Sequence, residues 1–162
     1  MNMWSTYFST TASIASSLTG LIFVGLSINV KKIFCITKTH LPSRAFGSLI
    51  LLTNIVIISN LCLVPNQPLA VLGSEILVMG IAIWIIVTKL DIIGYKTVED
   101  YYKKQYFRSL FYSQLSLLPI LAAGLFFIFH FTNAFYILLP GIIFSLIKSL
   151  FDIWFLMVDI NR

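Results

Sequence analysis

Five apolar stretches follow one another along this chain, and each has the length of about 20 residues that a helix needs to cross a bilayer. Only 10% of the 162 residues are charged and 59% are hydrophobic, whereas a soluble domain has about 25% charged residues. The sequence therefore predicts an all-α, polytopic integral membrane protein with a single transmembrane domain. Its five helices are expected at about 10–30, 45–64, 69–88, 109–130 and 134–157.

The connections between these stretches alternate in charge. Residues 31–44 and 89–108 hold most of the lysines and arginines, whereas 64–69 and 130–134 hold none. Lysine and arginine accumulate on the cytoplasmic side of membrane proteins. With an odd number of spans, this pattern predicts the N-terminus outside and the C-terminus in the cytoplasm. The composition is typical of small multi-pass proteins of bacterial inner membranes, so we expect location in the cell inner (plasma) membrane.

Small residues gather on one face of the first predicted helix. No positive charge precedes this stretch and two lysines follow it, so it is not a secretory signal and is expected to remain in the mature protein. Small side chains let two helix backbones approach closely and let hydroxyl groups bond across the contact. We therefore predict that this helix is the packing centre of the bundle. The expected helix-packing residues are Ala12, Ser16, Thr19, Gly20 and Ser27.

The short uncharged connections predict two helix hairpins. Residues 64–69 contain Pro65 and Pro68, which favour a tight turn, and 130–134 form a similar turn. The second and third helices, and the fourth and fifth, are then antiparallel neighbours. Within the fourth helix, Pro119 predicts a kink, and the small residues at 122–124 predict a close-packed face.

Polar side chains within the predicted spans are the residues that can carry chemistry in such a chain. In the fifth stretch, Ser145, Lys148, Asp152 and Asp159 fall on one face. Lys148 and Asp152 are four residues apart, so they can form an ion pair. This polar stripe either lines a water-filled or ion-conducting cavity, or forms an internal ion pair whose lysine reaches the inner interface.

Two further polar residues in other spans are candidates for the same lining. Glu75 lies about two turns from the outer end of the third stretch. It either binds a proton or cation, or is a capped or interface-exposed acid just inside the headgroups. Asn54 lies near the midplane of the second stretch, where amides commonly form hydrogen bonds between helices, and that structural role is favoured for it.

The connection 89–108 mixes aromatic and basic side chains and is expected to be amphipathic, with a helix from about residue 98 that continues into the fourth span. Aromatic residues at headgroup level and basic residues facing anionic inner-leaflet lipid explain this mixture. We expect no binding of nucleic acid. The expected lipid-anchoring residues are Lys31, Lys32, Lys103, Lys104 and Arg108.

Two functions fit this organisation. No nucleotide-binding loop, metal-binding spacing or nucleophile motif occurs in the sequence, so we expect no enzymatic activity, no cofactor and no metal. The polar stripe favours a homo-oligomeric pore or ion channel, lined by that stripe or by the small face of the first helix. The alternative is a non-conducting membrane scaffold or regulatory subunit that binds the helices of a membrane protein partner.

Overall fold

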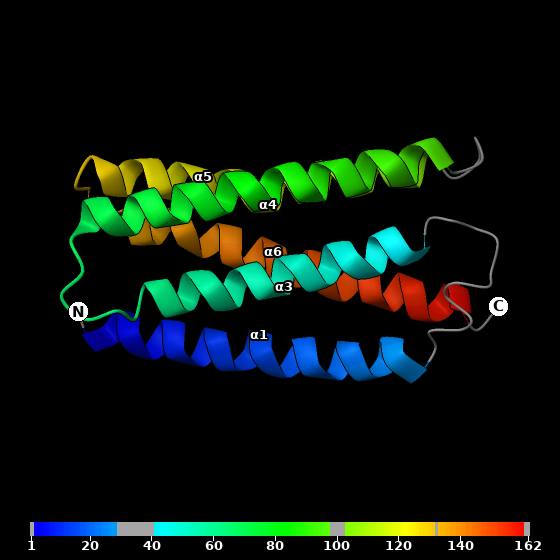
Figure 1. Cartoon of the computed structure of the whole chain (residues 1–162), viewed down its shortest axis with the longest axis horizontal. Coiled ribbons are helices and arrows are strands. Elements are labelled where there is room, and N and C mark those ends of the chain that lie inside the picture. The colour runs from blue at the N-terminus through cyan, green and yellow to red at the C-terminus, as the bar shows by residue number, and fades with distance from the viewer. Residues whose placement is uncertain (1, 29–40, 98–102, 132, 161–162) are drawn as a thin grey trace.

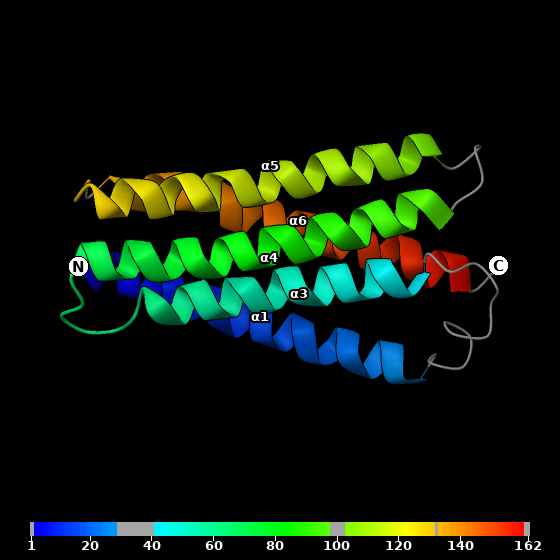
Figure 2. The same ribbon diagram turned by 45° about the horizontal axis from the view of Figure 1, so that its top comes forward.

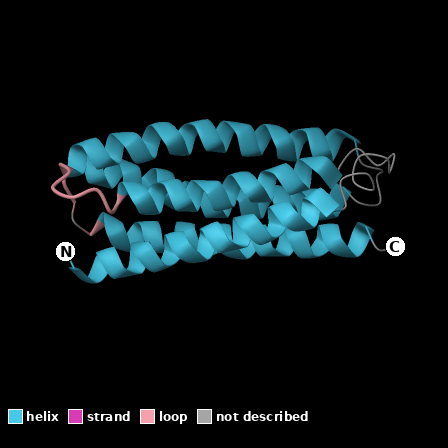
Figure 3. Cartoon of the chain, turned by 60° about the horizontal axis from the view of Figure 1, so that its bottom comes forward, coloured by secondary structure: helices cyan, strands magenta, loops and turns pink. Residues whose placement is uncertain are grey.

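The computed structural model describes residues 2–28, 41–97, 103–131 and 133–160. All regular structure in these residues is helical (Figure 3), which confirms the predicted all-α fold. The helices lie side by side, and α1 begins at one end of the bundle whereas α6 ends at the other (Figure 1). Their bounds are α1 (Asn2–Ile28), α3 (Leu41–Leu61), α4 (Leu69–Thr97), α5 (Lys103–Ile128) and α6 (Ala134–Ile160).

Four of the five helices are long and apolar enough to cross a membrane, namely α1, α4, α5 and α6. α3 has 21 residues and would rise about 32 Å, close to a hydrocarbon core of about 30 Å, although the part of it whose side chains are described, Ala45–Leu61, is shorter. The chain is therefore consistent with a multi-pass membrane protein. The fifth crossing and the orientation of the termini stay predictions.

The central helix is α3, so the prediction that the first helix is the packing centre is wrong. α3 packs against α1, α4 and α6, whereas α1 lies at the edge of the bundle and packs along α3 (Figure 2). The residues that α1 buries include Phe8, Ala15 and Ile22, which are spaced by seven, together with Thr11. This is the seam of a heptad repeat, and it lies on a different face from the small residues.

Two tight turns join α3 to α4 and α5 to α6, as the sequence predicts. Asn66 in the first turn has a φ of 57°, and His130 in the second has a φ of 60°. The His130 N–H donates to the Phe127 carbonyl at 3.0 Å, and the Phe131 N–H donates to the Phe126 carbonyl at 3.1 Å. These two bonds form a Schellman motif, which ends α5 at Ile128, with His130 as the left-handed residue that turns the chain towards α6.

Two helices extend beyond the predicted spans. α1 begins at Asn2 rather than near residue 10, and the hydroxyls of Thr10 and Thr11 donate to carbonyls four residues earlier in the same helix. α4 continues to Thr97, so residues 89–97 extend a spanning helix rather than belong to an amphipathic connection. α5 is helical from Lys103, and the expected helix start near residue 98 lies outside the described residues.

α4 and α5 approach each other closely through glycines. A Cβ atom placed on Gly73 would lie 2.7 Å from the carbonyl oxygen of Gly124 and 2.8 Å from the amide nitrogen of Ile128. A Cβ on Gly124 would lie 2.9 Å from Leu77. The close-packed face predicted after Pro119 is therefore confirmed. The close approach that the sequence assigned to the first helix occurs here instead.

Aromatic side chains fasten the beginning of α1 to the rest of the bundle. The ring of Trp4 stacks on that of Phe135 from α6, with centroids 5.4 Å apart. Phe135 also contacts Phe127 of α5 at 4.7 Å and Phe8 of α1 at 5.8 Å. This cluster lies at the end of the bundle where α1 begins, and it joins α1 to α5 and α6 there.

Candidate functional site

The polar stripe of α6 faces the inside of the chain. Ser145 and Ser149 are fully buried, and the side chains of Lys148 and Asp152 are each only 7% exposed. Positions 145, 148, 149 and 152 share one face because they recur every three or four residues. The structure thus brings three of the four predicted stripe residues together. The side chain of Asp159, the fourth, lies outside the described part of the structure.

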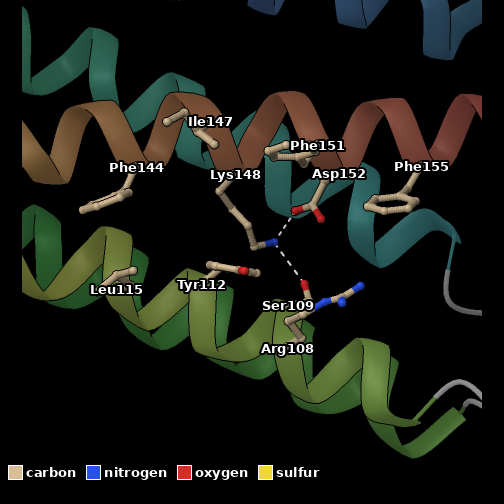
Figure 4. A pocket seen from close by; sticks show the side chains of 10 residues that line it. All are labelled: Arg108, Ser109, Tyr112, Leu115, Phe144, Ile147, Lys148, Phe151, Asp152 and Phe155. Carbon is tan, nitrogen blue, oxygen red and sulfur yellow. Dashed lines mark hydrogen bonds and ion pairs between the residues drawn. The ribbon is translucent and has the colours of Figure 1, made fainter.

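Lys148 and Asp152 form a buried ion pair, and α5 completes its hydrogen bonding. The Lys148 ammonium donates to the Asp152 carboxylate one turn further along α6 and to the hydroxyl of Ser109 on α5, at 3.0 Å (Figure 4). A buried charge is tolerated only when an opposite charge and further hydrogen bonds compensate for lost hydration. Here both are present, so the pair holds α5 and α6 together.

A second set of contacts joins the stripe to α3. The Ser149 hydroxyl lies 2.8 Å from the carbonyl oxygen of Ser145 and 3.3 Å from that of Ser48, which is buried on α3. The Ser145 hydroxyl has no hydrogen-bond partner among the described residues. The stripe therefore packs against α3 and α5 of the same chain, and its described side chains are almost entirely buried.

A pocket of about 310 Å³ opens between α5 and α6 beside the ion pair (Figure 4). Lys148, Asp152 and Ser109 supply its buried polar wall, and exposed Arg108 lies at its edge. Most of the other lining side chains are exposed, so the pocket opens on the outer surface of the bundle. These other residues are Tyr112, Leu115, Phe144, Ile147, Phe151 and Phe155.

Glu75 and Asn54 do not join this cluster. The Glu75 carboxylate accepts a hydrogen bond of 2.6 Å from the Gln67 side chain in the turn before α4. This contact is the capped state that the sequence allowed for the acid, in the second turn of α4. Asn54 is fully buried on α3, and neither polar atom of its side chain has a partner among the described residues. The interhelical hydrogen bond favoured for it is not formed there.

The predicted packing face of α1 is largely exposed. Ser16, Gly20 and Ser27 are exposed, whereas Ala12 and Thr19 are half-buried. A Cβ atom placed on Gly20 would meet nothing within 4 Å. Ser16, Gly20 and Ser27 therefore do not hold this chain's helices together, and their face of α1 is open to another molecule.

Of the predicted lipid-anchoring residues, Arg108 is the one whose side chain is described, and it is exposed on α5 beside the pocket. Lys31 and Lys32 lie outside the described residues. Lys103 and Lys104 belong to the first turn of α5, but their side chains lie outside the described part.

The sequence interpretation missed the α5 side of the site. Ser109, Ser113 and Ser116 are all buried on α5, and their spacing of four and three residues is the signal that could have identified a polar face. It also missed a link between α4 and α5, in which the Gln114 side chain accepts a hydrogen bond from Trp84 and donates one of 3.1 Å to Thr88.

The fold and the site define a class of protein: an all-helical chain whose long apolar helices are consistent with a multi-pass membrane protein, with an ion pair buried between two of them. Comparison with models of known protein families, with curated proteins and with solved structures finds no match to this chain.

Proposed function

We propose that this chain is a non-conducting membrane scaffold or regulatory subunit that binds a partner helix through the outward face of α1. The observation that carries the proposal is the open surface at Gly20 and its exposed small neighbours Ser16 and Ser27. Lipid chains gain nothing from small residues, whereas a second helix can approach closely over them. α1 is also the least buried of the four long helices, so it has the most surface left for a partner.

A homo-oligomeric pore is the second candidate, and exposed hydroxyls on α1 favour it. A ring of copies with this face towards the axis would present Ser9, Ser16 and Ser27 to a central path. The stripe of α6 is poorly placed for such a ring, because Lys148 and Asp152 are enclosed within one chain. For this reason the geometry favours helix binding over conduction.

Disulfide cross-linking tests whether α1 binds a second copy. In a background with Cys35→Ser and Cys62→Ser, Ser16→Cys is expected to give a cross-linked dimer when membranes are oxidised. The matched control is Val78→Cys, whose position on α4 is 68% exposed, and it should stay monomeric. Equal cross-linking at both positions would indicate random collision and contradict binding of a second copy through α1.

Ion flux separates the two candidates. The full chain reconstituted into liposomes is expected to leave the vesicles tight to small ions, while the cross-linking assay still reports a dimer. Flux that is abolished by Ser16→Leu would establish a pore lined by α1. Flux that is abolished by Asp152→Ala would instead assign conduction to the α6 stripe, and either result overturns the non-conducting proposal.

A further inference from the structure

We propose that the pocket between α5 and α6 binds one anionic phospholipid, with an acyl chain against its aromatic wall and the phosphate at Arg108. This site lies away from the face of α1, so the inference does not depend on the proposed function. It rests on the shape of the pocket, the placement of its charges and their depth along the helices.

The pocket has the size and the opening that a lipid chain requires. Its volume of about 310 Å³ is at the lower end of the roughly 300–1,000 Å³ typical of ligand sites. Five of its six apolar or aromatic lining side chains are exposed, including Ile147 at 43% and Phe151 at 57%. The pocket therefore opens sideways between two spanning helices, where acyl chains of the bilayer would lie.

The charges of the pocket favour an anion. Arg108 and Lys148 carry two positive charges against the single negative charge of Asp152, which leaves an excess of one positive charge. Asp152 and Ser109 accept hydrogen bonds from the Lys148 ammonium, which uses two of its three N–H donors. Arg108 has no hydrogen bond or ion pair within the described part of the chain, and a guanidinium binds phosphate oxygens through paired donors.

The depth of these groups matches the layout of a phospholipid. Arg108 is the last charged residue before the apolar stretch of α5. Lys148 lies near the middle of α6, and its ammonium reaches Ser109, the residue that follows Arg108 on α5. The phosphate therefore falls at Arg108, at headgroup level, and an ester carbonyl lies within reach of the remaining donor of Lys148.

Native mass spectrometry of the purified full chain in detergent tests this site. The probes are phosphatidylglycerol and phosphatidylcholine with identical acyl chains. We expect one phosphatidylglycerol to bind saturably and more tightly than phosphatidylcholine. Arg108→Gln should reduce that preference about fivefold, since one basic residue near a membrane surface contributes about this factor. Lys89→Gln, a matched exposed lysine on α4, should leave the preference unchanged.

A second variant tests the apolar half of the pocket. Ile147→Trp fills the opening and should abolish binding of both lipids, and Leu115→Trp serves the same purpose if the first variant loses its helical circular dichroism. Equal affinity for the two lipids, unsaturable binding, or equal losses in Arg108→Gln and Lys89→Gln would overturn the proposal. Displacement of the lipid by millimolar glycerol phosphate would also overturn it, because the site would then select a free phosphate group.

Discussion

Lys148 and Asp152 are residues whose charges are tolerated only as a pair. Lys148→Met leaves a buried carboxylate without its counter-charge, and we expect a loss of about 3–5 kcal/mol in the free energy of unfolding. The double variant Lys148→Met/Asp152→Leu removes both charges and should recover most of that loss. Unfolding by dodecyl sulfate in mixed micelles, followed by circular dichroism, measures both. A double variant no more stable than the single one would contradict this role for the pair.

His130 occupies a backbone conformation that suits glycine better. Its φ of 60° lies in the left-handed region, where a residue with a Cβ atom loses about 1 kcal/mol relative to glycine. We therefore expect His130→Gly to raise the free energy of unfolding by about that amount. Asn66→Gly, at a φ of 57°, is the matched control and should gain less, because asparagine tolerates this region. Equal thermal stability of His130→Gly and the unaltered chain would contradict the prediction.

At this scale, the sequence predicts contacts within a helix better than contacts between helices. The pairing of Lys148 with Asp152 follows from a spacing of four residues on one helix. The hydrogen bond from Lys148 to Ser109 depends on how α5 and α6 are aligned, and no local pattern sets that alignment. Asn54 shows the same limit. Its side chain is buried without a described hydrogen-bond partner, and this could not be predicted because it depends on which helices surround α3.

At the scale of the helices, the glycine contact between α4 and α5 is the sharpest test of packing. Gly73→Ala would place a methyl group 2.7–2.8 Å from backbone atoms of α5 that cannot move aside, and we expect it to cost about 1–3 kcal/mol. Gly47→Ala, where a Cβ atom meets nothing within 4 Å, should be neutral or slightly stabilising, since alanine is the better helix former. A cost no larger for Gly73→Ala than for Gly47→Ala, measured by dodecyl sulfate unfolding, would contradict the close approach.

Helix existence was predictable here, but the choice of central helix was not. In a soluble protein the buried face of a helix is its apolar face. In lipid both faces are apolar, so exposed Leu21 and Phe23 on α1 resemble its buried Phe8 and Ile22 in composition. The small residues were the other pattern that could identify a packing face of α1, and they indicated a face that this chain leaves exposed. The heptad spacing of the buried residues was the more informative pattern.

At the scale of the whole molecule, the number of membrane crossings decides the arrangement of the chain. α3 has 21 residues (Leu41–Leu61) and rises about 32 Å, close to a hydrocarbon core of about 30 Å. It also packs against α1, α4 and α6, so much of its surface meets other helices rather than lipid. The bundle is therefore compatible with five crossings.

Tags at the two termini distinguish five crossings from four. With five, an N-terminal tag is accessible from outside intact cells and a C-terminal tag becomes accessible only after permeabilisation, as the clustering of lysine and arginine predicts. With four, α3 does not cross and both tags report the same compartment. Adding lysines to the turn between α3 and α4, as Pro65→Lys/Gln67→Lys, should weaken the preferred orientation, because that turn then competes for the cytoplasmic side. If both tags of the unaltered chain report the same compartment, both ends of α3 lie on one face of the membrane. That result would contradict the structure, in which α3 runs side by side with the spanning helices (Figure 1).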